Sequence, residues 1–308
     1  GFSERGDLSR KQAQQELKDF SKRTGLRICG PNCLGVANVA AGIWATASQL
    51  PEDNDTNALS IGPVALVSHS GATAFGPIMI RAKEIGLGFS HIISTGNEVD
   101  LESSDFIAYL LEDPDVKVVA CFIEGFKDGR KLISVAERAL ELDKRIVLIK
   151  VGRSEVGSKA ALSHTAAMTG SDSVHNAAFK QFGIIRSNEW DELLHTADLL
   201  AHNSAPSESG VVLVSHSGGV SSMIADHLGQ ADIPLPPLTS DTQVKISNLL
   251  GGFGWSANPA DITVFANRPQ FGEILRLLET EPQAGAMVIA TFGNHNQVEQ
   301  IKSLKTES

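Results

Sequence analysis

The chain has 308 residues, of which 42% are hydrophobic, and its formal net charge is −10 at pH 7. This length suggests two domains, and the acidic balance argues against a nucleic-acid partner or an anionic membrane surface. The three cysteines are odd in number and lack metal-ligand spacing, so we expect no disulfide scaffold, no metal site and a reducing cytoplasm. We also find no apolar run long enough to span a bilayer and no signal-peptide pattern.

The first 40 residues resemble the last unit of an α/β domain. The pattern predicts a helix over 8–24 and a short strand over 26–29, followed by the turn-rich segment 30–35. The earlier strands and helices of such a domain are missing. We therefore expect the chain to be a fragment or a split gene product.

From residue 62 onward, apolar strands alternate with helical segments. Strands are predicted over 64–68, 89–94, 116–123, 146–151 and 183–186, with helices over 71–85, 103–111, 128–142, 173–182 and 189–202. After the polar stretch 203–210, a second series starts at 211, with helices over 220–228, 239–250 and 269–278 and a strand over 285–291. Strands that are nearly continuous Val, Ile and Leu runs favour parallel sheets covered on both faces.

One strand-to-helix junction occurs twice. Residues 64–72 are VALVSHSGA, and residues 211–219 are VVLVSHSGG. Small residues leave the first N–H groups of a helix open, so each junction is a candidate anion site. A tight turn explains either copy alone, but two matching copies favour a shared purpose. The candidate phosphate-binding residues are Ser70, Gly71 and Ala72, and Ser217, Gly218 and Gly219.

Two other functions do not fit these junctions. A hydrolase nucleophile elbow needs glycine both two residues before and two residues after the serine, and neither copy has both. A dinucleotide site is not predicted, because no G-x-G-x-x-G follows a strand.

A long loop over 153–172 carries His164, a side chain that can act as base and nucleophile. On its own this segment is equally consistent with an exposed loop and an incidental histidine. Glu124 directly follows an apolar strand, at the end where open α/β sheets bind ligands. The alternative for Glu124 is an ordinary acid at a strand end.

Together these features resemble the nucleoside-diphosphate-forming acyl-CoA synthetases, relatives of the succinyl-CoA synthetase α subunit. The matching segments, in family order, are GPNCLG at 30–35, VSHSG at 67–71, STGNEVD at 94–100, IEG at 123–125, GRS at 152–154, SHT at 163–165 and NPAD at 258–261. The resemblance implies α/β architecture with two flavodoxin-like parallel-sheet domains, over 58–203 and 208–308. It also implies that residues 1–40 are a remnant of a Rossmann-like CoA-binding domain.

The resemblance further implies a phosphoryl relay. Acyl-CoA and phosphate give an acyl phosphate, which phosphorylates His164; the phosphohistidine then passes its phosphoryl group to a nucleoside diphosphate. Glu124 would accept a hydrogen bond from the other ring nitrogen, and the two Ser-Gly junctions would hold the phosphoryl group from opposite sides. Asn32 and Cys33 would lie near the thiol of CoA, although Cys33 is equally well a small buried hydrophobe. Asn97 would position the acyl phosphate or cap the next helix.

CoA and phosphate would be substrates, and ATP or ADP with Mg would bind an ATP-grasp domain that we do not find here. We therefore expect an ATP-grasp domain or β subunit as partner, in cis or in trans, and an oligomer. Two positions depart from the family: Ala166 stands where Gly is common, and His69 where Gln is more usual. The rival hypothesis is a catalytically silent regulatory or assembly module of a larger protein. The acid that is activated and the choice between ADP and GDP remain open.

Overall fold

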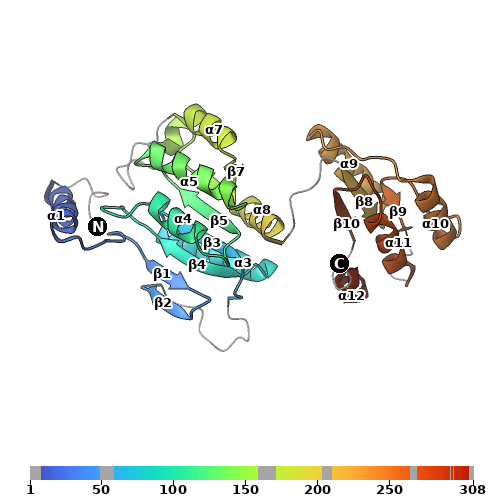
Figure 1. Cartoon of the computed structure of the whole chain (residues 1–308), viewed down its shortest axis with the longest axis horizontal. Helices are drawn as coiled ribbons and strands as arrows, with labels where there is room; N and C mark the ends of the chain where they lie inside the picture. Colours follow the sequence, from blue (N-terminus) through green and yellow to red (C-terminus); the bar gives the residue numbers. More distant parts are fainter. Residues whose placement is uncertain are drawn as a thin grey trace. The chain divides into compact units, whose positions relative to one another are not determined.

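The computed structural model describes residues 8–48, 59–158, 171–202, 210–263, 269–291, 293 and 295–304. The chain divides into two compact units, Gly1–Asn203 and Ser204–Ser308, each of which is described by itself (Figure 1). His164 lies outside the described residues.

The first unit is built on a seven-stranded sheet with the order β2-β1-β4-β3-β5-β6-β7. The strands β3 to β7 run parallel, and the antiparallel hairpin of β1 and β2 extends the sheet beside β4. The strands are β1 (Gly35–Asn38), β2 (Ile43–Thr46), β3 (Val64–Ser68), β4 (Phe89–Ser94), β5 (Val118–Ile123), β6 (Arg145–Lys150) and β7 (Ile185–Ser187). The second parallel strand lies outside the first, which is the flavodoxin-like order.

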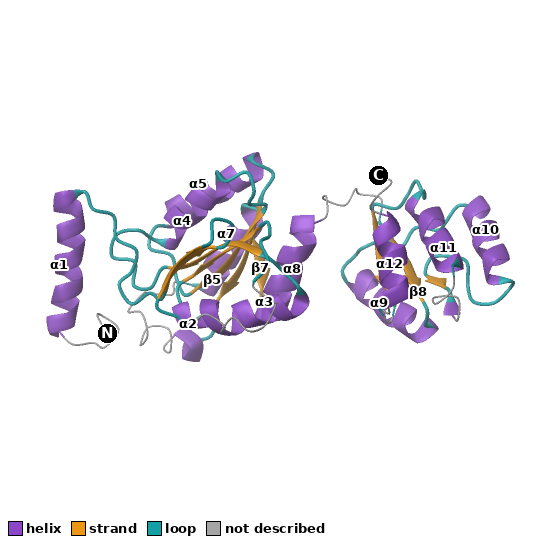
Figure 2. Cartoon of the chain, turned by 90° about the horizontal axis from the view of Figure 1, so that it is seen from below, coloured by secondary structure: helices purple, strands orange, loops and turns teal. Residues whose placement is uncertain are grey.

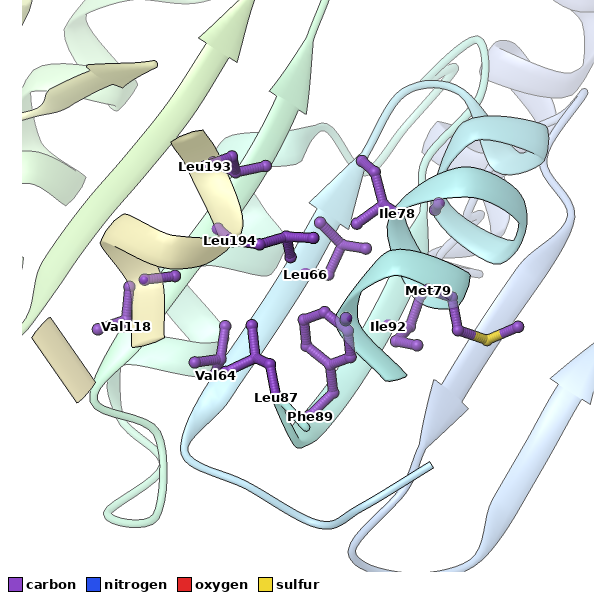
Figure 3. Packing of buried hydrophobic residues seen from close by; sticks show 14 of the residues in the cluster. Val64, Leu66, Ile78, Met79, Leu87, Phe89, Ile92, Val118, Leu193 and Leu194 are labelled. Atoms are coloured by element: carbon purple, nitrogen blue, oxygen red, sulfur yellow. The ribbon is translucent and has the colours of Figure 1, made fainter. Parts of the chain in front are cut away.

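Helices cover both faces of this sheet because successive strand residues point to opposite sides (Figure 2). Val64 and Leu66 of β3 pack with η2 (Ala74–Ile78), α3 (Met79–Ile85) and α8 (Trp190–His202), the layer seen in Figure 3. The short helix α2 (Gly71–Thr73) leads from β3 into η2. Ala65 and Val67 pack with α4 (Ser103–Leu111), α5 (Gly129–Glu141) and α7 (Asp172–Gln181). The expected parallel sheet with two covered faces is confirmed.

The helix predicted over 71–85 is interrupted. Its middle part, η2, is π-helical, and Gly76 has φ −107° and ψ −111°, outside the helical region. Pro77 follows, with no N–H to donate and a ring that crowds the preceding turn. The proline therefore divides the segment into the short turn α2 and the helix α3.

The strand predicted over 26–29 was wrong. This segment follows α1 (Leu8–Thr24) and runs beside a loop, where Leu101 N donates to Ile28 O at 3.1 Å and Val99 N to Gly30 O at 2.9 Å. No regular ladder forms, because the partner is a loop. The hairpin of β1 and β2 was not predicted, since each strand has only four residues.

The second unit contains a parallel sheet, with the order β10-β8-β9 among the described residues. Its elements are β8 (Val211–Ser215), α9 (Gly218–Gln230), α10 (Ser240–Leu250), β9 (Ala260–Asp261), α11 (Gln270–Glu279), β10 (Ala286–Ala290) and α12 (His295–Leu304). Val212 and Val214 of β8 pack in its core with Ile274 and Leu275 of α11. β9 and α12 were not predicted, because one is two residues long and the other is polar. Across the described ranges of both units, no helix is long and apolar enough to cross a membrane.

Candidate active site

Glu124 lies at the carboxyl edge of the first sheet, directly after β5. Its Oε2 atom is buried and has no hydrogen-bond partner among the described residues. The main-chain N–H of Glu124 donates to Nδ1 of His69 at 3.2 Å. His69 is the residue directly after β3. A buried carboxylate oxygen without a donor costs free energy. Oε2 is thus an acceptor that the described part of the chain does not use.

The Ser70 junction joins β3 to α2. Ser70 Oγ accepts a hydrogen bond from Thr73 N at 3.3 Å, and Ser68 Oγ donates to Ser70 O at 2.8 Å. A Cβ atom on Gly71 would lie 2.7 Å from Leu34 Cβ and 2.8 Å from Ser94 Oγ. Close packing therefore requires glycine at position 71 whether or not an anion binds. Ala72 beside it is exposed.

The Ser217 junction in the second unit repeats this geometry. Ser217 Oγ accepts from Val220 N at 3.5 Å, and Ser215 Oγ donates to Ser217 O at 3.2 Å. A Cβ atom on Gly218 would lie 3.1 Å from Asp261 Oδ2, whereas one on Gly219 would find its nearest neighbour at 3.9 Å. A carboxylate thus lies beside the first turn of α9, and an anion bound there would also meet Asp261.

Asn32 and Asn97, the two candidate asparagines for the CoA and acyl groups, meet directly. Asn32 Nδ2 donates to Asn97 Oδ1 at 3.1 Å, and Asn97 Nδ2 donates to Gln14 Oε1 of α1 at 2.8 Å. The residue that caps α4 is Glu102, so the alternative that Asn97 caps this helix was wrong.

Cys33 follows Asn32 and is half-buried, as is Cys29. The Cys29 thiol donates to Ser94 O at 3.3 Å, and the Cys33 thiol donates to Cys29 O at 3.7 Å. The neighbouring Cys29 side chain lowers the pKa of Cys33 to about 6. The Cys33 side chain, together with burial, raises the pKa of Cys29. A lowered pKa is typical of a reactive thiol and not of an inert buried one.

Glu98, in the loop after β4, was missed by sequence reasoning. It is 4% exposed, and its Oε1 lies 3.0 Å from His69 Nε2 and accepts from Ser103 N at 2.7 Å. Burial alone would raise the pKa of Glu98, but the hydrogen bond from His69 and the charge of Lys127 outweigh it, so the net shift is downward. The sequence signal was an acid placed directly after a turn-forming Gly-Asn pair.

Lys150, the last residue of β6, was also missed. It is 2% exposed, and its Nζ donates to Val151 O at 2.6 Å. Burial lowers the pKa of Lys150, while the charges of Asp172 and Glu124 oppose that shift. The available signal was one lysine within the otherwise apolar run 146–151.

The residues of the NPAD segment stabilise the second unit. Asn258 Nδ2 donates to Val211 O at 2.9 Å and to Pro236 O at 2.8 Å, while Asn258 Oδ1 accepts from Leu213 N at 2.9 Å. Asp261 Oδ1 accepts from Thr263 N at 3.0 Å. Asn258 therefore holds the start of β8 in place.

Residues 61–200 match the family of the succinyl-CoA ligase like flavodoxin domain. The chain is 32% identical, over 99% of its length and 65% of the relative's, to acetate–CoA ligase [ADP-forming] II subunit alpha of Pyrococcus furiosus. It is also 32% identical to 4-hydroxybutyrate–CoA ligase [ADP-forming] of Nitrosopumilus maritimus, over 94% of this chain and 40% of that protein.

A solved structure extends the likeness to the fold. It is the dinucleotide forming acetyl-coenzyme A synthetase 1 of Ca. Korarchaeum cryptofilum, in complex with phosphate and ADP. The match has a TM-score of 0.86 and 28% identity, over 99% of this chain and 66% of that one. The chain thus spans less than two thirds of the length of each of these relatives.

Proposed function

Because the chain belongs to the superfamily of NDP-forming acyl-CoA synthetases, we propose that it is the phosphohistidine-bearing segment of an ADP-forming acyl-CoA synthetase. The complete enzyme interconverts acyl-CoA, ADP and phosphate with a carboxylic acid, CoA and ATP. The names of its relatives, which are ADP-forming ligases, support ADP over GDP.

The proposed reaction has three transfers. An oxygen of phosphate attacks the thioester carbonyl, the C–S bond breaks, and CoA leaves as the thiolate. A ring nitrogen of His164 then attacks the phosphorus of the acyl phosphate, and the carboxylate leaves. Finally an oxygen of the β-phosphate of ADP attacks the phosphohistidine, which yields ATP and restores His164.

The Glu124 carboxylate is the observation that carries this proposal. Its Oε2 is buried without a partner among the described residues, at the strand end where open α/β sheets bind ligands. A ring N–H of His164 would supply the missing donor. That hydrogen bond would orient the imidazole and stabilise its positive charge as the other nitrogen attacks.

We assign phosphoryl binding to main-chain groups of the two junctions. The Oγ atoms of Ser70 and Ser217 already accept hydrogen bonds within their own turns. The N–H groups of the residues that follow then remain as donors to an anion. These residues are Gly71, Ala72, Gly218 and Gly219.

We assign Asn32, Cys33 and Asn97 to the thiol and acyl ends of acyl-CoA. The contact between Asn32 and Asn97 supports this grouping. We further assign residues 1–40 to the end of a CoA-binding domain, and 58–203 and 208–308 to the two ligase domains. An ATP-grasp domain or β subunit, in cis or in trans, would bind Mg and the nucleotide, in the cytoplasm.

The test is the intact mass of the chain under non-acidic conditions after incubation with Mg-ATP and an ATP-grasp subunit of an ADP-forming relative. We expect one acid-labile phosphoryl group, which is absent in His164→Ala and formed much more slowly in Glu124→Gln. A control chain from that relative shows that the subunit is active. If the control is phosphorylated and this chain is not, the catalytic proposal fails and the regulatory-module hypothesis replaces it.

A further inference from the structure

We propose that His69 and Glu98 are positioning residues that hold Glu124 and the Asn97 loop in one fixed arrangement. The proposal rests on the proposed function, because it assigns these two side chains to the reaction in which Glu124 takes part. Neither side chain needs to touch the reacting atoms.

The hydrogen bonds of His69 define its tautomer. Its side chain is 5% exposed, and its Nδ1 accepts from the main-chain N–H of Glu124 at 3.2 Å. A nitrogen that accepts this hydrogen bond carries no proton, so the ring is neutral with its proton on Nε2. That N–H points at Glu98 Oε1, 3.0 Å away, and donates to it.

The main chain of His69 joins the same strand ends. His69 N donates to Phe122 O of β5 at 3.0 Å, and His69 O accepts from Gly96 N, after β4, at 3.2 Å. One residue therefore links the ends of β3, β4 and β5. The residue that bears the candidate carboxylate, Glu124, is hydrogen-bonded to the His69 ring through its main-chain N–H.

Glu98 connects the His69 ring to the start of α4. Its Oε1 also accepts from Ser103 N at 2.7 Å, at the start of α4. Lys127 Nζ donates to the main-chain carbonyls of Asn97, at 2.7 Å, and of Glu98. The loop that presents the Asn97 side chain is thus held from both sides, and its position is tied through His69 to that of Glu124.

The second unit shows that the SHSG sequence does not impose this tautomer. His216 occupies the corresponding position, and its Nδ1 lies 3.1 Å from Ala290 O. A carbonyl only accepts, so Nδ1 of His216 carries a proton and donates. Nδ1 of His69 carries no proton because its neighbour is the N–H of Glu124.

This arrangement predicts which substitutions of His69 preserve the rate of phosphorylation. Gln at position 69 retains one acceptor and one donor, whereas Leu retains neither and leaves the Glu98 carboxylate buried without its imidazole donor. A shift of about 1 Å in a catalytic group costs about 100-fold in rate. We therefore expect His69→Leu to slow phosphorylation by about 10- to 100-fold and His69→Gln by no more than about 3-fold.

The experiment measures the rate constant of phosphorylation from Mg-ATP with the ATP-grasp subunit, per folded molecule. It compares the wild type, His69→Gln, His69→Leu and Glu98→Gln. His91→Leu, which removes another buried imidazole from β4, serves as the control and should retain the wild-type rate constant whatever its thermal midpoint. The positioning role is refuted if His69→Leu matches the wild type or if His69→Gln is as slow as His69→Leu.

A second measurement, by nuclear magnetic resonance, tests the tautomer directly. It uses the wild type, with His69→Gln to identify the signals of the His69 ring by their loss. Nitrogen-15 chemical shifts of the His69 ring should show an unprotonated Nδ1 and a protonated Nε2. The reverse pattern, or a charged ring at neutral pH, would overturn the proposal even if His69→Leu does not fold. Failure of the wild type to become phosphorylated would instead count against the proposed function.

Discussion

Asp172 and Arg186 form a two-pronged ion pair, with Asp172 Oδ1 2.5 Å from Arg186 Nη2 and Oδ2 3.2 Å from Nη1. Asp172 begins α7 and Arg186 lies in β7, so the pair joins a helix to the edge strand of the sheet. The Arg186 side chain is 11% exposed. The hydrogen bond from Arg186 lowers the pKa of Asp172.

We expect Asp172→Asn to lower the free energy of unfolding of the first unit by about 1–3 kcal/mol at pH 7, because it leaves a largely buried guanidinium without its carboxylate. A lowered carboxyl pKa stabilises above the unfolded pKa of about 3.9, and this contribution is lost as the pH falls through the lower folded pKa. The difference from the wild type should therefore shrink below about pH 4. Urea unfolding followed by tryptophan fluorescence measures it.

Asp143→Asn is the matched control for this pair. Asp143 also contacts an arginine, Arg145, at 2.8 Å, but its side chain is 90% exposed. We expect a change of less than about 0.5 kcal/mol. Equal effects of the two substitutions at pH 7 would contradict the prediction.

The two Ser-Gly junctions should respond oppositely to an added methyl group. Gly71→Ala places a Cβ 2.7 Å from Leu34 Cβ, and we expect a loss of about 1–3 kcal/mol in the stability of the first unit. Gly219→Ala meets no heavy atom closer than 3.9 Å, and replacing an exposed helical glycine should stabilise the second unit by up to about 1 kcal/mol. Thermal unfolding of both variants tests the contrast, which fails if Gly71→Ala is neutral.

Lys150→Met should raise stability at pH 7. No carboxylate oxygen of the described residues lies within ion-pair distance of its Nζ, and burial lowers the pKa of Lys150. A lysine with a lowered folded pKa destabilises while it is charged, and this penalty fades as the pH rises toward the unfolded pKa of about 10.4.

The stabilisation by Lys150→Met should therefore decrease between pH 7 and pH 10 in urea unfolding. Lys117→Met, at an exposed lysine directly before β5, provides the control for the replacement of a lysine by methionine. If the stabilisation by Lys150→Met grew with pH instead, the pKa of Lys150 in the folded state would be raised and not lowered.

Cys33 should be the most reactive thiol of the chain at mildly acidic pH. Its pKa of about 6 predicts that alkylation by iodoacetamide is half-maximal near pH 6. Mass spectrometry of the peptides measures the extent of alkylation. Cys29→Ala removes the neighbouring side chain that lowers this pKa and should move the midpoint upward, toward the ordinary thiol value of about 8.5. Cys121 is fully buried with a raised pKa and should remain unmodified. A Cys33 midpoint that Cys29→Ala leaves in place would contradict the assignment.

Much of the fold was readable from local patterns. The strands 64–68 and 89–94 and the helix 103–111 form with the predicted bounds, because buried parallel strands are apolar runs and helices show their own period. The helix over 71–85 was predicted through Pro77, whose breaking effect a local reading could have included. The short strands β1, β2 and β9 depend on pairing partners far along the chain, and no local signal marks them.

The amino-acid sequence by itself determined the alternation of strands and helices, the doubled Ser-Gly junction and the acid after β5, since each is a local arrangement of residue types. Only the tertiary structure decided that the side chains of Asn32 and Asn97 meet, and that Glu124, His69 and Glu98 form one hydrogen-bonded chain. His69, Glu98 and Glu124 lie after three different strands, β3, β4 and β5, and are far apart in the sequence. Their contacts follow from the order of the strands in the sheet, which sets which strand ends are neighbours.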